Sequence, residues 1–418
     1  MLRRFAWFTD CMSPMRHPFF VWFCAALFVL TIAAIPRAVH SQQGAPSPQP
    51  VPRSEYAGDE SCRSCHASEF DTFERTAHHL TSRFPNAQTI AGKFTSGANV
   101  LTTFNPLLSF RMEEKDGSFN QVAVTGEPPH VSYHRERIDF VIGSGGKGQT
   151  YLYWRGDRLF ELPVSYWTEL GRWVNSPGYL DGVADFDRPV DPRCLECHAT
   201  YIHSVSASLS GNEFDKSSAV LGISCERCHG PGRAHVALFQ SPPASITDTR
   251  IVNLAKLSRD LGLGVCGQCH GGLGRPLAPA FSYRPGEPLD KFIELQQPGP
   301  QENVDVHGNQ IALLERSKCL QASGSLTCWT CHDEHAQERP AASYSQRCLT
   351  CHKPENCGLF AKLGRAIASD CVDCHMPVQD SHVIVSDDNG RHVSAHVRNH
   401  WIKVYPQFQA MPANIQRN

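Results

Sequence analysis

The chain is almost neutral and is poor in methionine. Its 39 lysines and arginines and 41 aspartates and glutamates leave a formal charge of −2 on 418 residues. This balance gives no reason to expect a nucleic-acid partner. Only Met112, Met376 and Met411 follow residue 41, so methionine can supply few metal ligands. Cysteine and histidine are the abundant ligand residues, with 18 and 21 copies.

The first 41 residues are typical of an export signal. Positive residues precede an apolar run at residues 18–35, and small residues near residue 41 provide a cleavage point. The run also approaches the length of about 18 residues that indicates a membrane span. Residues 1–41 are therefore a signal peptide or a retained N-terminal anchor that tethers the protein, and residues 42–54 are a Pro/Ser-rich linker. We expect the protein in the periplasm or at the outer face of the cytoplasmic membrane.

Fourteen of the sixteen cysteines beyond residue 41 form one repeated pattern, in which C-x-x-C is followed directly by histidine. We number these motifs 1 to 7 in chain order. Their first cysteines are Cys62, Cys194, Cys225, Cys266, Cys328, Cys348 and Cys371. Their second cysteines are Cys65, Cys197, Cys228, Cys269, Cys331, Cys351 and Cys374.

The spacing within the motif matches the chemistry of covalent haem attachment. Two thiols three positions apart can each add to a vinyl group of one haem, and the next residue then reaches the iron. Structural zinc commonly takes two C-x-x-C pairs, and disulfides need no adjacent histidine. Seven motifs cannot be matched into pairs, so we predict seven haem c groups with iron as the metal. The proximal ligands are then His66, His198, His229, His270, His332, His352 and His375.

Histidine is also the expected second ligand of each iron. Twelve histidines outside the motifs follow residue 41, including three near the C-terminus at residues 392, 396 and 400. This supply predicts mostly bis-histidine, low-spin haems of low potential. His335 lies three residues after His332, and in a helix that spacing places both on one face. Axial ligands approach from opposite faces, so we expect His335 to bind a neighbouring haem; the alternative is a surface histidine.

The motif positions divide the chain into segments. Residues 55–99 carry motif 1, and residues 181–405 carry motifs 2 to 7 as a multihaem cytochrome c domain. Residues 100–180 hold no motif and read as an inserted antiparallel β meander, with a hairpin turn at Asp116-Gly117. Residues 406–418 are a C-terminal tail. We expect a mainly α and irregular multihaem cytochrome c fold in which haems form much of the core.

Two further groups of residues lie beside the motifs. Cys319 and Cys357 are the cysteines left over after residue 41, and an exported protein with an even remainder is expected to pair them in a disulfide. Four aromatic residues precede motif 2, and we expect them to pack on haem faces and edges. The alternative is that a tyrosine or tryptophan among them lines an open haem. They are Tyr166, Trp167, Trp173 and Tyr179.

Four segments resemble the tetrahaem cytochrome c-554 of nitrifying bacteria, and more distantly hydroxylamine oxidoreductase and the octahaem nitrite and tetrathionate reductases. They are YAGDESCRSCH…TAHH, GISCERCHGPGRAHV, RSKCLQASGSLTCWTCHDEH and DCVDCHMP…NHWI. The resemblance implies distal ligand roles for His78, His235, His335 and His400, with His307, His134 and His203 as further candidates. The chain departs from these relatives in having seven motifs and no C-x-x-C-K motif.

Two functions remain open at this point. The first is transfer of single electrons through stacked haems to or from redox partner proteins or quinol-linked membrane complexes. The second is an oxidoreductase that acts on hydroxylamine, nitrite or a sulfur oxyanion at one five-coordinate haem. The missing lysine motif and the density of haems favour electron transfer. Fold resemblance alone does not decide between them, because one scaffold can host both roles.

Overall fold

The computed structural model describes residues 48–409, apart from residues 242, 244, 246, 297, 300 and 301. The predicted signal or anchor, residues 1–41, lies outside the described residues. Contacts divide the chain into Met1–Pro46 and Ser47–Asn418, and the description below concerns the second unit. None of the described helices combines the length and the hydropathy of a membrane span.

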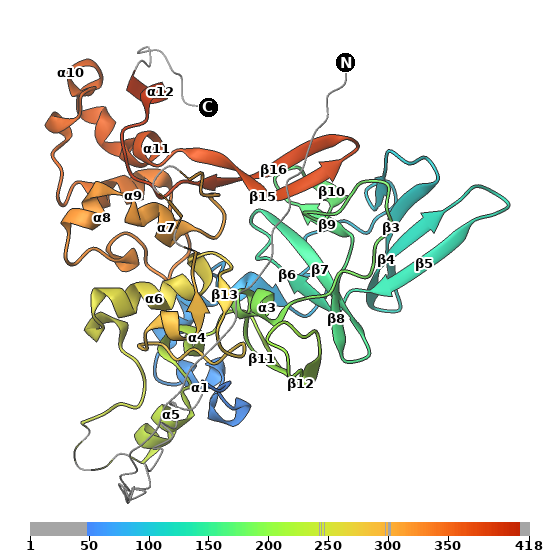
Figure 1. The fold of residues 1–418 in the computed structure, drawn as a ribbon, viewed down its shortest axis with the longest axis horizontal. Helices are drawn as coiled ribbons and strands as arrows, with labels where there is room; N and C mark the ends of the chain where they lie inside the picture. The colour runs from blue at the N-terminus through green and yellow to red at the C-terminus, as the bar shows by residue number, and fades with distance from the viewer. Residues whose placement is uncertain are drawn as a thin grey trace, which may run out of the picture. The chain divides into compact units, whose positions relative to one another are not determined.

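The helices are short, and several contain a motif or the segment beside one (Figure 1). Side-chain caps fix where some of them begin. Asp191 accepts a hydrogen bond from the Arg193 amide at the start of the helix of motif 2, and Ser224 accepts one from the Glu226 amide at the start of the helix of motif 3. The α-helices are α1 (Asp59–Arg63), α2 (Ala67–Phe73), α3 (Pro192–His198), α4 (Cys225–His229), α5 (Arg233–Gln240), α6 (Arg259–His270), α7 (Gln310–Glu315), α8 (Lys318–Ala322), α9 (Ala341–Cys348), α10 (Phe360–Leu363), α11 (Cys371–His375) and α12 (Pro406–Gln409). The 3-10 helices are η1 (Arg53–Glu55), η2 (His79–Thr81), η3 (Leu254–Lys256), η4 (Leu289–Lys291), η5 (Cys328–Thr330), η6 (Pro354–Asn356) and η7 (Gly364–Ser369).

Two antiparallel sheets lie between motifs 1 and 2. One contains β2 (Val100–Thr102), β3 (Leu108–Lys115), β4 (Ser118–Thr125) and β5 (Ser132–Arg137) in that order. The other has the order β1 (Ser82–Arg83), β6 (Phe140–Ile142), β7 (Gly148–Arg155), β9 (Val164–Trp167) and β10 (Arg172–Asn175), with β8 (Arg158–Glu161) also paired to β7. Asp116 and Gly117 connect β3 to β4 with φ values of 51° and 72°, which suit a tight hairpin turn.

The aromatic residues before motif 2 belong to these sheets. Tyr166 and Trp173 are buried in the cluster that also holds Tyr151, and their rings meet edge to face with centroids 5.2 Å apart. The Trp173 ring lies so close to Gly92 that a Cβ there would overlap it. Alternation along β9 places Trp167 on the other face, in a second buried cluster, and Tyr179 is buried with its hydroxyl on the Glu161 carbonyl oxygen. The expectation that these aromatics pack on haem faces is therefore corrected, because protein side chains and backbone surround them.

Antiparallel pairing continues well beyond the predicted insert. The additional pairs are β11 (Ala199–Ser204) with β12 (Phe214–Leu221), β13 (Arg275–Pro276) with β14 (Ile293–Glu294), and β15 (Val378–Asp388) with β16 (Arg391–Arg398). The fold of the described residues is thus mixed, with short helices and several antiparallel sheets. The prediction of a mainly α chain was too narrow, because it treated the segments between later motifs as irregular.

The hairpin of β15 and β16 packs against the sheet between motifs 1 and 2 (Figure 1). The guanidinium group of Arg172 on β10 donates to the Asp388 carboxylate on β15 at 2.9 Å. The Ser386 hydroxyl donates to the Asn175 carbonyl oxygen at 2.6 Å. These contacts connect a segment just after motif 7 to the β-rich part of the fold.

Candidate functional site

Four motif histidines each face a second histidine from a distant segment of the chain. The second histidines come from the segments after motifs 1, 3 and 5 and from the C-terminal end. The ring-centroid separations are 6.5 Å for His66 and His235, 6.1 Å for His270 and His78, 6.0 Å for His229 and His335, and 6.2 Å for His332 and His400.

These separations fit a metal ion held between the two rings. Two imidazoles that bind one ion from opposite sides, each through a metal–nitrogen bond of about 2 Å, place their centroids roughly 6 Å apart. The ring planes are nearly parallel in the pairs of motifs 3 and 5, at 11° and 23°, and nearly perpendicular in the pair of motif 4, at 82°. Each of these motifs therefore combines two thiols with imidazoles on both sides, which is the donor set that haem c requires.

Burial favours the neutral imidazole, which is the form that binds a metal. Burial lowers the pKa of His78 to about 4, with a smaller contribution from His270. Burial likewise lowers the pKa of His400 to about 4. Both rings are thus available as ligands at neutral pH.

Backbone carbonyl groups orient several of these rings. The Nδ1 atom of His229 donates to the Val252 carbonyl oxygen at 2.9 Å, and that of His235 donates to the Thr249 oxygen at 2.8 Å. His375 in motif 7 makes the same contact with the Lys403 oxygen, at 2.8 Å. A carbonyl can only accept, so Nδ1 carries the proton and Nε2 is left for a metal.

Motif 2 differs from the four paired motifs in how its histidine, His198, lies relative to a second histidine. Burial lowers the pKa of His198 to about 4, and His307 contributes through its charge. His307 is therefore close enough to interact with His198, although no ring-to-ring contact like those of the four pairs is found for these two rings in the described residues. The backbone N–H of His307 donates to Asp305 at 2.8 Å, and the same carboxylate accepts a hydrogen bond from Ser381 at 2.9 Å.

The remaining predicted ligands are not brought to a motif histidine. His203 is exposed on β11. His134 stacks on Phe186 with centroids 4.3 Å apart. Near the C-terminus, His392 and His396 are exposed on β16, where the His396 ring contacts the Asp380 carboxylate at 2.8 Å.

In the described residues, motifs 6 and 7 differ from the four paired motifs. Within the part of the chain that the structure describes, neither His352 nor His375 lies against a second histidine ring. His352 is exposed, whereas His375 is partly buried. In the described residues, the histidines of four motifs therefore face a second histidine ring, that of motif 2 has His307 nearby, and those of motifs 6 and 7 face none.

Thiols from different motifs lie within hydrogen-bonding distance of each other. Motifs 1 and 3 meet through Cys62 and Cys225, motifs 2 and 4 through Cys197 and Cys269, and motifs 4 and 5 through Cys266 and Cys328. Motif 5 also packs on α6, where Gly262 lies so close to the Trp329 ring that a Cβ would overlap it. The attachment points of at least five motifs are thus near neighbours.

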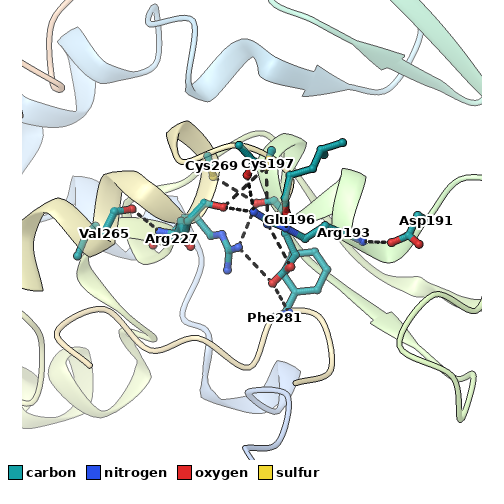
Figure 2. Close-up of polar contacts among 11 residues, drawn as sticks. Asp191, Arg193, Glu196, Cys197, Arg227, Val265, Cys269 and Phe281 are labelled. Carbon is teal, nitrogen blue, oxygen red and sulfur yellow. Dashed lines mark hydrogen bonds and ion pairs between the residues drawn. The ribbon is translucent and has the colours of Figure 1, made fainter. Parts of the chain in front are cut away.

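A buried polar network joins motifs 2, 3 and 4 through the residues inside and beside them (Figure 2). Arg193, just before motif 2, donates to the Gln268 carbonyl oxygen of motif 4 at 2.6 Å. Arg227 inside motif 3 donates to the Glu196 carbonyl oxygen of motif 2 at 3.0 Å. The Glu196 carboxylate accepts from the Phe281 amide at 2.8 Å and lies 3.3 Å from the Arg193 guanidinium group.

A second buried carboxylate, Glu226, connects motif 3 to motif 1 and to α5. It accepts hydrogen bonds from the backbone N–H groups of Ala57 at 2.7 Å, Gly58 at 2.9 Å and Gly232 at 2.7 Å. The first two lie at the start of α1, which contains Cys62, and the third lies at the start of α5, which contains His235. One side chain therefore holds both segments whose histidines face each other at motif 1.

The sequence analysis missed four residues inside the motifs, because it assigned no role to the two positions between the cysteines. They are Glu196, Glu226, Arg227 and Gln268. Charged residues are rarely buried unless they are paired or hydrogen-bonded. Position within the motif does not predict the burial, because Asp373 at the second central position of motif 7 is exposed whereas Glu226 at the first central position of motif 3 is buried.

The predicted disulfide between Cys319 and Cys357 is wrong in this structure. Both are free thiols. Cys319 lies on α8 and interacts with Cys331 and Cys348, whereas Cys357 interacts with the two cysteines of motif 7. The two thiols lie beside different motifs. An even number of cysteines outside the motifs therefore did not mean that these two lie close together.

Comparisons with known proteins gave two matches, and both are to cytochromes. The family model described as "Cytochrome c554 and c-prime" matches residues 180–230, the stretch with motifs 2 and 3. The crystal structure of the outer cell wall cytochrome OcwA is similar in fold, with a TM-score of 0.53 at 17% identity over 84% of this chain and 80% of that chain. A search of the curated proteins gave no match. Nothing in these comparisons bears on the resemblance to hydroxylamine oxidoreductase.

Proposed function

Starting from its similarity to multihaem c-type cytochromes, we propose that this chain is an exported electron-transfer protein with seven covalent haem c groups. The observation that carries the proposal is the set of four opposed histidine pairs, each beside a pair of thiols. Each bound haem supplies an iron that takes up or releases one electron.

The side chains of the protein have three tasks in this proposal. The motif thiols hold the group covalently, and the two imidazoles bind its metal from both sides. Closure of both axial positions keeps substrates and water from the iron, which suits electron transfer better than catalysis. Carbonyl groups such as that of Val252 fix the ring of the proximal histidine, as outer-sphere hydrogen bonds do at other metal sites.

The close approach of motifs supports transfer within the chain. Electron transfer falls steeply with distance, so redox centres in a conducting protein must be near neighbours. The thiol contacts join motif 1 to motif 3, motif 2 to motif 4, and motif 4 to motif 5. These contacts supply the neighbour relations that a path for electrons needs.

The location and partners follow from the same proposal. We place the protein in the periplasm or at the outer face of the cytoplasmic membrane, in keeping with the apolar run at residues 18–35. Its fold resembles that of an outer cell wall cytochrome, which supports an exported location. Its partners are redox proteins or quinol-linked membrane complexes.

A second candidate function is favoured by motifs 6 and 7. His352 and His375 do not face another imidazole in the described residues, so a haem at either motif would have one side open to a small ligand. Hydroxylamine, nitrite or a sulfur oxyanion is the class of substrate for such a site. The protein would then be a multihaem oxidoreductase whose other haems deliver electrons.

Mass spectrometry and electron paramagnetic resonance of the mature protein test these functions together. The electron-transfer proposal expects seven haem increments, low-spin ferric signals from at least the four paired centres, and no turnover of nitrite or hydroxylamine. A mass with fewer increments contradicts the seven-haem proposal. A high-spin signal that shifts when nitrite is added, together with turnover, favours the oxidoreductase.

A further inference from the structure

Buried negative charge lies beside motifs 1 and 3. Glu226 is 3% exposed, and its carboxylate accepts the three backbone hydrogen bonds described above. Among the described residues, no lysine or arginine lies within ion-pair distance of it. Asp59 adds a second carboxylate, which accepts a hydrogen bond from the Cys225 amide at 3.3 Å. Both carboxylates interact electrostatically with the thiol of Cys62.

Buried positive charge lies beside motifs 2 and 4. Arg193 and Arg227 are each 5% exposed, and Glu196 is the carboxylate between them, so the three side chains carry one net positive charge. Both arginines interact electrostatically with the thiols of Cys197 and Cys269. The Arg193 guanidinium group lies 3.8 Å from the Cys197 sulfur. The excess charge is therefore in direct contact with an attachment point of motif 2.

The two charges stand on adjacent residues of one motif. In C-E-R-C-H, the Glu226 carboxylate contacts the starts of α1 and α5, whereas the Arg227 guanidinium group contacts Glu196 on α3 and interacts electrostatically with Cys269 on α6. Arg227 also interacts with Cys228 of its own motif. Neighbouring positions of a single helical turn project to different sides, and so the same turn presents an anion to motif 1 and a cation to motifs 2 and 4. Screening by water is weak at both places because the side chains are buried.

We infer that Glu226 and Arg227 polarise the haem array, so that the centre of motif 1 has a lower reduction potential than those of motifs 2 and 4, while motif 3 senses both charges. This inference rests on the proposed electron-transfer function. A buried anion stabilises the oxidised form of a nearby redox centre, and a buried cation stabilises the reduced form. The pair gives the path a direction, from motif 1 toward motifs 2 and 4.

Each step along this path conserves charge without bond chemistry. One centre is oxidised by one electron while its neighbour is reduced by one, and no proton or leaving group is involved. Transfer within the chain needs no further reagent. Electrons enter from a one-electron donor and leave to a one-electron acceptor of the redox-protein class.

Spectropotentiometric titration of the intact protein, followed by electron paramagnetic resonance, tests the inference. Arg227→Gln removes the cation, and Arg227→Lys is the matched control that retains it. Asp59→Asn removes an anion while keeping an oxygen that can accept from the Cys225 amide. Haem content by mass is measured for every variant, so that a failure of the seven-haem proposal is seen separately.

The expected shifts have opposite signs. In Arg227→Gln a subset of signals becomes harder to reduce, with the ferric-to-ferrous ratio at fixed potential rising about tenfold, or about 59 mV for one electron. In Asp59→Asn a different subset becomes easier to reduce, and Arg227→Lys stays close to the unaltered protein. The inference is overturned if variants with full haem content show no shift in reduction potential, or the same shift at every centre. The buried charged residues would then have a purely structural role. If Arg227→Gln does not accumulate, Arg193→Gln replaces it with the same expectation.

Discussion

The imidazole rings of His229 and His335 lie almost parallel, with centroids 6.0 Å apart and an interplanar angle of 11°. His335 follows motif 5 directly in sequence, yet it faces the histidine of motif 3. The motif 5 histidine, His332, faces His400 instead. Two histidines three residues apart thus serve two different centres, and this links motifs 3 and 5 in space.

Replacing His335 with alanine should open one haem only. His335→Ala removes one of the two rings at motif 3, and we expect one low-spin ferric signal to be replaced by a five-coordinate, high-spin signal with a raised potential. Electron paramagnetic resonance measures this change. His203→Ala is the control, because His203 is exposed on β11 and should leave every signal unchanged.

The same measurement on His400→Ala provides a second comparison. Its loss should affect a different low-spin signal, and the double variant should lose both. If His335→Ala changes no signal, His335 is a surface residue. If the two single variants abolish the same signal, the assignment of separate centres is wrong.

Glu226→Ala should destabilise the protein strongly. It leaves three backbone N–H groups without their acceptor, each costing about 1–3 kcal/mol, so the free energy of unfolding should fall by roughly 3 kcal/mol or more. Glu55→Ala is the matched control, because its ion pair with Arg284 is about 40% exposed on both sides and is worth at most about 1 kcal/mol. Denaturant unfolding followed by tryptophan fluorescence compares the two. Equal losses of stability would contradict the role given to Glu226.

Two glycines of α6 should respond differently to alanine. At Gly262 a Cβ would overlap the Trp329 ring of motif 5, so Gly262→Ala should cost about 1–3 kcal/mol through overpacking. At Gly264 the nearest atoms are 3.5 Å and 3.6 Å from a built Cβ, so Gly264→Ala should be neutral or stabilising by up to about 1 kcal/mol. Thermal unfolding of both variants decides this, and a similar loss in both would show that Trp329 does not fix the packing there.

Alkylation should label two cysteines beyond residue 41 in the haem-loaded protein. Cys319 and Cys357 are free, whereas the motif cysteines would be consumed by thioether bonds. Iodoacetamide under denaturing, non-reducing conditions, followed by peptide mapping, should label two cysteines beyond residue 41, and Cys319→Ser should reduce this to one. A chain that takes up no label until a reductant is added would restore the disulfide that the sequence predicted.

Carbon monoxide should bind to at most two haems of the reduced protein, those of motifs 6 and 7. The opposed histidine pairs exclude it at motifs 1, 3, 4 and 5, and we expect His307 to exclude it at motif 2. The spectral change at the Soret band gives the stoichiometry. His78→Ala should add one equivalent, because it removes the ring opposite His270. More than two equivalents in the unaltered protein would show that further centres are open.

Local chemistry was readable from the sequence. The thiols and proximal histidines follow from covalent spacing within five residues, and the turn at Asp116-Gly117 follows from the positive φ values that a tight hairpin requires. The hairpin of β3 and β4 forms at the predicted place. In such cases the determinants lie within a few positions of each other.

Contacts between residues that lie far apart in the sequence were much harder to predict. Nothing in the spacing shows that His78 meets motif 4, or that His392 and His396 remain on a hairpin while His400 faces motif 5. These outcomes depend on how β15 and β16 dock on β10 through residues such as Arg172 and Asp388. The charges inside the motifs were missed for the same reason, because their partners lie on other helices.

In a protein exported as proposed, the position of each facing histidine along the chain would set the order in which the motifs are completed. The chain emerges from its N-terminal end, so motif 1 is outside before His235, motif 3 before His335, and motif 5 before His400. At these three motifs the thiols would be accessible for haem addition before the second imidazole arrives to cover the other side, so closure would proceed from late segments onto early ones. Motif 4 has the opposite order, because His78 precedes its thiols in the chain. A nascent chain halted just before residue 400 would leave motif 5 without its second imidazole, and a haem held there would be open to side reactions with oxygen.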